Sequence, residues 1–199
     1  MDRGELGAAA EIFQAAFAHE HASRYREGAR ANSFLHVWSF LHELEPESFL
    51  AAREDGRLVG YAIFVPSLRR VQWEALRSGA LLRWSLIALR GGFGLRLSAV
   101  WRVLMNKIMF LRSGGRYRSK GDAQLINIAV LPEAQGRGIA KALVREGLRV
   151  MRMRGVPEVR LEVRPWNHRA VRLYENTGWR QVGQTRDLEG EWLVMVANP

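Results

Sequence analysis

The sequence contains no cysteine. This absence excludes disulfides, zinc sites built on thiolates and a cysteine nucleophile. Histidine is also scarce: five histidines occur in 199 residues, and no two of them have the His-x-x-x-His spacing that places two ligands on one helical face. We therefore expect no bound metal.

The N-terminus lacks a charged region followed by an unbroken apolar stretch and a cleavage site, so we expect no export signal and a cytoplasmic location. A length of 199 residues suits one well-buried core and is too short for two full domains. The sequence therefore predicts a single domain over residues 1–199.

Acidic residues are nearly missing from one segment. Residues 66–120 contain twelve arginines and lysines but a single acid, Glu74, so this segment carries a charge of +11 in a chain whose formal net charge is +10. The other 144 residues together carry −1. The basicity therefore belongs to this one segment and not to the whole chain.

Three strands are predicted around the basic segment. Residues 48–53 and 58–65 form two of them, and the Asp55-Gly56 pair between them is a strong hairpin signal. After the basic segment, the β-branched run 123–130 ends shortly before Pro132 and predicts a third strand.

Residues 5–45 have a helical pattern. Two apolar stripes recur at helical spacing, one made of Leu6, Ala9, Ala10, Phe13 and Phe17 and the other of Phe34, Leu35, Trp38, Leu41 and His42. The sequence opens almost directly into the first of these stripes.

A glycine-rich turn follows the strand 123–130. It consists of Gln135, Gly136, Arg137, Gly138, Ile139 and Ala140, and apolar residues recur at helical spacing after it. The two glycines allow a ligand to approach the backbone, and the first-turn N–H groups and dipole of the helix favour an anion there. Arg137 adds a positive charge. The turn is typical of a phosphate site, although an ordinary helix-capping turn would look similar.

A second motif comprises Asn167, Ala170, Leu173-Tyr174-Glu175, Gly178 and Trp179. The pattern Gln-x-x-Gly-x-Ala at residues 135–140 resembles the acetyl-CoA pyrophosphate loop of the GNAT acetyltransferase superfamily, and the second motif is similar to that family's other signature. The resemblance covers roughly residues 49–65 and 123–197. It is closest to the bacterial enzymes that acetylate the N-terminal amine of a ribosomal protein, which also carry a Leu-Glu-Val-Arg strand, here residues 161–164.

The resemblance implies an α/β fold: a mixed, mostly antiparallel sheet of six to seven strands flanked by helices, with a V-shaped opening for acetyl-CoA. The implied reaction is direct transfer of an acetyl group to a primary amine in a ternary complex. The resemblance does not decide whether the acceptor is a peptide or protein amine or a small-molecule amine. A catalytically silent CoA-binding module is the alternative. The family's usual leading strand has no room before the first helix.

Cofactor contacts are expected from the resemblance and from the chemistry of the reaction. The expected contacts come from the main chain of Ile128, Ala129 and Val130, from residues 135–140, from Asn167 and from Tyr174. A bulge or splay at the strand end would leave N–H groups free to stabilise the charge that develops on the thioester oxygen. Asn167 also suits a helix N-cap. Asn127 is a candidate for acceptor binding, or it caps the strand ladder.

Acetyl transfer to an amine needs a proton acceptor and a proton donor. Tyr174 occupies the position of the family's tyrosine and is the candidate donor to the departing thiolate, although a purely structural tyrosine would fit the same helix. Glu162 is the candidate base. It shares a strand face with Arg160 and Arg164, so an ordinary salt bridge is an equal alternative.

The basic segment 66–120 is an insertion between the third and fourth strands of the family's order. It predicts a helical hairpin, with helices over 71–90 and 95–112. Arginines interrupt its apolar runs every six or seven residues, which rules out the roughly 20 residues that a membrane span needs. A packed flap or homodimer contact, and peripheral contact of 71–112 with an anionic inner membrane face, are both open. Nucleic acid is less favoured, because tryptophan and leucine dominate over lysine.

Overall fold

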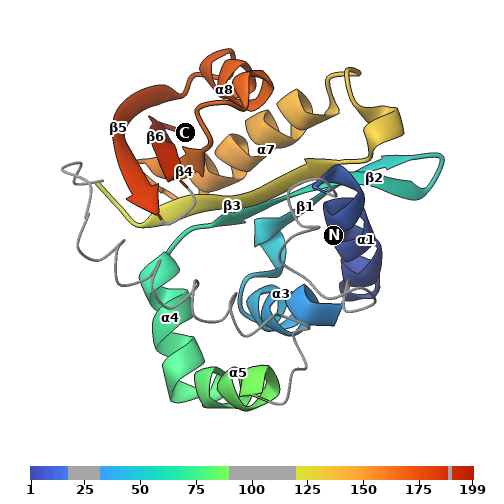
Figure 1. The fold of residues 1–199 in the computed structure, drawn as a ribbon, viewed down its shortest axis with the longest axis vertical. Coiled ribbons are helices and arrows are strands. Elements are labelled where there is room, and N and C mark those ends of the chain that lie inside the picture. Colours follow the sequence, from blue (N-terminus) through green and yellow to red (C-terminus); the bar gives the residue numbers. More distant parts are fainter. Residues whose placement is uncertain (18–31, 90–119, 188–189) are drawn as a thin grey trace.

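The computed structural model describes residues 1–17, 32–89, 120–187 and 190–199. Figure 1 shows one sheet with helices on both faces. The elements are η1 (Arg3–Glu5), α1 (Leu6–Ala16), α3 (Asn32–Leu44), η2 (Pro46–Ser48), β1 (Phe49–Glu54), β2 (Arg57–Val65), α4 (Leu68–Arg77), α5 (Ala80–Leu89), β3 (Ala123–Val130), η3 (Pro132–Ala134), α7 (Ile139–Met153), β4 (Val159–Val163), α8 (His168–Glu175), β5 (Arg180–Asp187) and β6 (Gly190–Ala197).

The sheet has six strands in the order β1-β2-β3-β4-β6-β5. Every neighbouring pair is antiparallel except β3 and β4, which are parallel. This confirms the predicted α/β fold with a mixed, mostly antiparallel sheet. The described residues contain no strand before β1, so the family's leading strand is absent from that part of the chain.

The parallel pair β3 and β4 separates soon after it begins. Cross-strand pairing is confined to Ala123 with Val159 and Gln124 with Arg160. The register between β2 and β3 shifts so that Ile126 is an extra residue on β3, and such a bulge bends a strand and increases its twist. Beyond Gln124 the two strands diverge, which opens the sheet at its centre.

Helix α7 packs closely on one face of the sheet (Figure 1). Its buried stripe contains Leu143, Val144 and Met151, at the helical spacing that the sequence predicts. Gly147 lies against Phe64 of β2, and a Cβ at this glycine would stand 2.1 Å from the phenyl ring. The close approach therefore depends on glycine.

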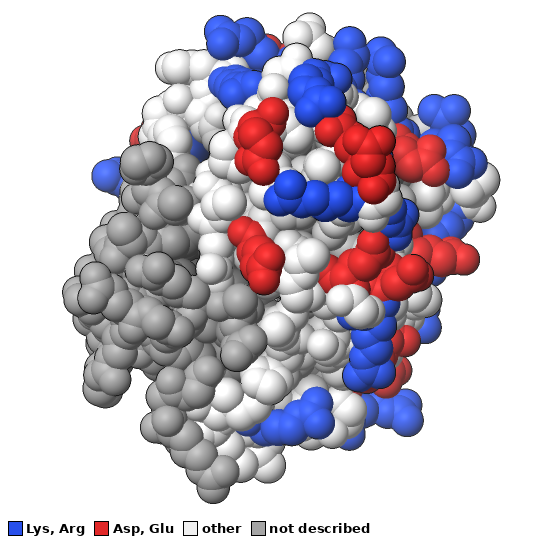
Figure 2. All heavy atoms as spheres, turned by 90° about the vertical axis from the view of Figure 1, so that its right-hand side faces the viewer, with Lys and Arg blue, Asp and Glu red and all other residues white. Residues whose placement is uncertain are grey.

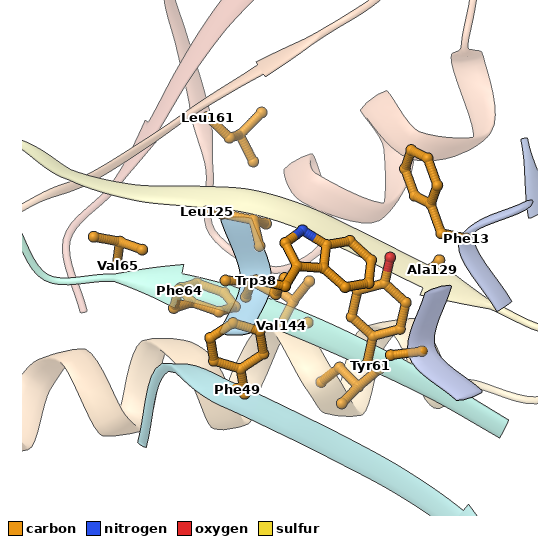
Figure 3. Packing of buried hydrophobic residues seen from close by; sticks show 14 of the residues in the cluster. Phe13, Trp38, Phe49, Tyr61, Phe64, Val65, Leu125, Ala129, Val144 and Leu161 are labelled. Carbon is orange, nitrogen blue, oxygen red and sulfur yellow. The ribbon is translucent and has the colours of Figure 1, made fainter. Parts of the chain in front are cut away.

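Helices α1 and α3 cover the opposite face (Figure 1). Figure 3 shows Tyr61 of β2 beside Trp38 of α3, with Phe13 of α1 nearby. The Trp38 ring centroid lies 5.3 Å from that of Tyr61 and 5.9 Å from that of Phe13, both in edge-on contact. These aromatic rings attach the N-terminal helices to the sheet.

The described first part of the insertion is helical and packed, but it differs from the prediction. Instead of one helix over 71–90 there are two, α4 and α5, which are separated at Ser78 and Gly79, where Gly79 has a φ of +68°. Val71, Ala75 and Ala80 are buried in the main core, so this half of the insertion belongs to the domain.

The second predicted helix, over 95–112, lies outside the described residues. Within the described part of the chain, no helix is long and apolar enough to cross a membrane.

Polar contacts hold the start of the insertion in place. The Asp122 carboxylate accepts hydrogen bonds from the Ser67 hydroxyl at 3.0 Å and from the Arg69 N–H at 2.7 Å. The buried Glu45 carboxylate accepts from Arg70 of α4 at 2.9 Å and from Arg154 after α7 at 2.7 Å. One carboxylate therefore joins segments that are more than 80 residues apart in sequence.

Candidate active site

The predicted phosphate loop has the backbone that anion binding requires. Gly136 and Gly138 have φ angles of +81° and +83°, in the region that favours glycine. Gly138 is the N-cap of α7, and no heavy atom lies within 4 Å of where its Cβ would be. The first-turn N–H groups of α7 therefore border an open surface, where the start of a helix favours an anion.

The loop is tied to its surroundings through Gln135. Its Nε2 donates to the Val130 carbonyl at 3.1 Å, and its Oε1 accepts from an Arg169 guanidinium nitrogen at 3.0 Å. The other terminal nitrogen of Arg169 lies 3.9 Å from the Cβ position of Gly136. The loop and the N-terminal turn of α8 therefore meet, and Arg169 brings a positive charge to the glycines.

Arg137, the basic residue singled out within the loop, has a different partner. Its guanidinium forms a 2.8 Å ion pair with Glu54 at the end of β1. Figure 2 shows acidic and basic side chains interspersed on the face where the β1–β2 turn lies. The charge of Arg137 is balanced locally, so Arg169 is the better candidate for the positive charge at the loop.

The side chains of β3 alternate between the two faces of the sheet. Asn127 and Ala129 pair with β2 residues on the side of Tyr61, which contacts Trp38 of α3. Ile128 and Val130 therefore face α7. The strand thus presents its amide side chain to the N-terminal helices, while its main chain borders the opening between β3 and β4.

Asn127 is held by Tyr61. The Tyr61 hydroxyl donates to Asn127 Oδ1 at 2.8 Å, which leaves the Asn127 amide NH₂ to donate elsewhere. Burial raises the pKa of Tyr61, so the hydroxyl keeps its proton and remains a donor. Tyr61 was not predicted as a site residue, because only the register of β2 and β3 brings it to Asn127.

Helix α8 positions Asn167 at its start and Tyr174 near its end. Asn167 is the N-cap, and its Oδ1 accepts from the Ala170 N–H at 3.1 Å. Tyr174 is buried against Trp179, with ring centroids 5.8 Å apart. Burial raises the pKa of the Tyr174 hydroxyl, so it stays protonated and can donate a hydrogen bond.

Glu162 forms the ion pair that competes with its role as a base. Its Oε1 accepts from Arg160 at 2.6 Å, and the pair is partly buried. Arg164 turns elsewhere, with its guanidinium 3.7 Å from the centre of the Trp192 ring and 3.4 Å from the Asp187 carboxylate. Within the described residues, Glu162 Oε2 has no hydrogen-bond partner, so one oxygen is oriented and the other is free to accept a proton.

The sequence did not predict two of the site residues, Arg169 and Tyr61, for different reasons. Arg169 lies inside the second motif, two residues after Asn167, so its place at the start of a helix was a usable signal. Tyr61 had no such signal, because it stands 66 residues before Asn127. Together these groups comprise a glycine loop at a helix N-terminus, an opening between β3 and β4, a buried tyrosine hydroxyl and a carboxylate oriented by an arginine.

The chain matches the model of the acetyltransferase (GNAT) family over residues 11–179. It is 39% identical over 71 residues to a mycothiol acetyltransferase of Acidothermus cellulolyticus, a stretch that covers 36% of this chain and 21% of that protein. It is 40% identical over 60 residues to the ribosomal protein bS18-alanine N-acetyltransferase of Escherichia coli, covering 30% of this chain and 40% of that enzyme. The matched stretches thus span less than half of either relative.

The fold agrees with this match. A putative acetyltransferase of Salmonella typhimurium, solved with its cofactor acetyl-CoA, superposes with a TM-score of 0.58 at 16% identity and covers 100% of this chain and 90% of its own. This likeness concerns the fold, whereas the family match covers most of the sequence. The chain belongs to the acetyltransferase (GNAT) family.

Proposed function

We propose that this protein is an acetyl-CoA-dependent N-acetyltransferase that acts on a primary amine. The observation that carries the proposal is the opening between β3 and β4, because the glycine loop and the first turn of α7 directly follow the strand that borders it. The acetyl-CoA bound to a structural relative supports the same cofactor here. Acetyl-CoA supplies an acetyl group already activated as a thioester.

Loop and strand groups hold and orient the cofactor in this proposal. The N–H groups of residues 136–140 bind the diphosphate, and Arg169 adds charge-assisted hydrogen bonds. Main-chain N–H groups of residues 128–130 stabilise the negative charge that develops on the thioester oxygen. Asn167, already the cap of α8, contributes its amide NH₂.

The acceptor amine approaches from the side of α1 and α3. Asn127 faces that side, and Tyr61 orients it so that its NH₂ can position the acceptor. An ammonium must lose a proton before its nitrogen can attack, and Glu162 Oε2 takes that proton directly or through one water. Arg160 serves to orient this carboxylate.

Tyr174 carries out the second proton transfer. The amine nitrogen bonds to the acetyl carbon in a ternary complex, the carbon–sulfur bond breaks, and the tyrosine hydroxyl gives its proton to the departing sulfur. The proton accepted by Glu162 returns to solvent, and solvent reprotonates Tyr174. No covalent enzyme intermediate is needed.

The proposed acceptor is a small-molecule or peptide amine. One relative is named a ribosomal protein bS18-alanine N-acetyltransferase, and another is named a mycothiol acetyltransferase. Helices α4 and α5 lie on the same side of the sheet as α1 and α3 (Figure 1). The insertion thus borders the acceptor side, which favours a small or envelope-related amine over a large folded partner.

The decisive experiment combines calorimetry with acetyl-CoA and a free-thiol release assay over a panel of amines. Tyr174→Phe keeps the ring that packs on Trp179 and removes only the donor. We expect kcat to fall about 100-fold, with acetyl-CoA affinity nearly unchanged.

Binding without thiol release for every amine would favour the silent CoA-binding module instead. A lack of heat with acetyl-CoA would overturn the cofactor assignment itself.

A further inference from the structure

Helices α4 and α5 turn large apolar side chains towards solvent. On α4, Trp73 is 58% exposed and Leu76 is 60% exposed. On α5, Leu82 is 68% exposed, and Leu81 and Leu86 are each 45% exposed. We refer to these five residues as the outer face. Large exposed apolar patches on a folded protein mark sites that bind another protein, a ligand or a membrane.

The outer face is not the side by which the two helices pack on the domain. The inner side of α4 buries Val71 and Ala75, and that of α5 buries Ala80. Trp84 of α5 meets Phe40 of α3 edge-on, with ring centroids 5.3 Å apart. The two helices therefore pack on the domain through one side, and the outer face is directed away from the core.

Two exposed basic residues lie on the same helices as the outer face. Arg77 of α4 and Arg83 of α5 are exposed, and neither has an acidic partner within the described part of the chain. The insertion contains one acid, Glu74, which is half-buried. Exposed tryptophan and leucines on helices that also carry unpaired arginines fit a surface that has an apolar interior and an anionic boundary.

We propose that the outer face docks on an anionic lipid surface, so that the protein binds a membrane peripherally. Trp73 and the leucines would enter the boundary between headgroups and acyl chains, while Arg77 and Arg83 pair with lipid phosphates. Figure 1 shows α5 at the end of the molecule opposite α8.

Charge and composition favour lipid over two other occupants. A second copy of the chain in a twofold dimer would place positively charged surfaces against each other. Nucleic acid would use the arginines but would leave the leucines in water, because its outer surface is phosphate. An anionic membrane satisfies both the charge and the apolar side chains.

The test is co-sedimentation of the full-length protein with vesicles of phosphatidylglycerol and phosphatidylcholine, compared with vesicles of phosphatidylcholine alone. Binding is expected to the anionic vesicles and to weaken as salt is raised. Leu82→Glu with Leu86→Glu should reduce binding at least about tenfold. Arg77→Gln and Arg83→Gln should each weaken it about fivefold, which corresponds to about 1 kcal/mol per basic residue.

Matched controls come from α7, where Met153 and Arg145 are also exposed. Met153→Glu and Arg145→Gln should leave binding unchanged. Equal loss in these controls, or equal binding to neutral vesicles, would overturn the proposal. So would an oligomer in light scattering that the Leu82→Glu change dissociates, since a second copy would then cover the face.

Two further outcomes also count against lipid. A fall in melting temperature caused by Leu82→Glu would show that the chain itself covers the outer face. RNA binding that the arginine variants lose and the leucine variants keep would identify a nucleic acid instead.

Discussion

At the residue scale, the role of Glu162 depends on which of its oxygens is used. Arg160 occupies Oε1 at 2.6 Å and leaves Oε2 without a partner in the described structure. We expect Glu162→Gln to lower kcat about 100-fold because the amide cannot accept the proton, whereas Arg160→Gln should lower it less than about tenfold. Steady-state kinetics of both variants provide the measurement.

The two variants separate the base from the structural salt bridge. If Glu162 only pairs with Arg160, both substitutions break the same contact and must give similar losses in kcat and in melting temperature. Equal losses would therefore remove the base from the mechanism and leave proton transfer to water.

Arg169 is expected to act on cofactor affinity rather than on the chemical step. It reaches the loop through Gln135 and lies beside Gly136. Arg169→Ala should raise the KM for acetyl-CoA about tenfold or more, because a charge-assisted hydrogen bond is lost. Isothermal titration with CoA measures the same loss at equilibrium.

Arg172, one turn further along α8, is the matched control. It is exposed and has the same charge, so Arg172→Ala tests the contribution of general positive charge on this helix. A similar weakening in both variants would mean that Arg169 has no specific contact with the cofactor.

Single residues were predictable where their role is local. Asn167 caps its own helix, and Gly136 and Gly138 take the backbone angles expected of their loop. The Tyr61–Asn127 and Gln135–Arg169 contacts join residues 66 and 34 positions apart. Such contacts depend on how whole elements pack, which no local pattern records.

At the element scale, the packing of α7 on β2 depends on one glycine. Gly147→Ala should lower the free energy of unfolding by about 1–3 kcal/mol, because the new Cβ would meet the buried Phe64 ring at 2.1 Å. Gly7 of α1 provides the comparison, since nothing lies within 4 Å of its Cβ position. Gly7→Ala should raise stability by up to about 0.5 kcal/mol. Urea unfolding of both variants measures the difference.

A neutral or stabilising result for Gly147→Ala would show that α7 can move away from β2 at little cost. That outcome would weaken the view that the helix dictates the position of the glycine loop at its N-terminus.

Strand boundaries followed from local signals, but one helix boundary did not. The Asp55-Gly56 turn has φ angles of +49° and +79°, as a tight hairpin requires, and β3 spans the predicted residues 123–130. The apolar pattern runs through Ser78 and Gly79 without interruption, so periodicity alone favoured one helix. The positive φ of Gly79 allows the chain to turn there, and packing of Ala80 into the core uses that turn.

At the scale of the whole molecule, alkaline pH should weaken the fold. Burial raises the pKa of Tyr61 and of Tyr174 above the ordinary 10.0, so the folded state keeps protons that the unfolded chain releases. Stability is therefore fully present below pH 10 and declines as pH rises beyond it. Each tyrosine contributes a slope of about 1.4 kcal/mol per pH unit in that range.

Urea midpoints measured from about pH 9 to pH 11 test this expectation. Tyr174→Phe should flatten the decline, while its absolute stability near neutral pH serves as the reference. An unchanged slope would mean that the Tyr174 hydroxyl ionises as easily in the folded protein as in the unfolded chain.

The overall architecture was largely foreseeable, because two motifs in the right order identify a family whose sheet is known in outline. The placement of the insertion was not foreseeable, since Glu45, Arg70 and Arg154 meet only in the folded chain. The sequence therefore predicted that a helical insertion exists, and the structure shows that its first half is part of the core.

The short pairing of β3 with β4 has a mechanical consequence. Two rungs, at Ala123 and Gln124, join the three-stranded halves β1-β2-β3 and β4-β6-β5. Thermal fluctuations should part the molecule along this seam before they disturb the longer antiparallel ladders. A ligand bound between the two halves of the sheet would restrict their relative motion, and its release would restore that motion.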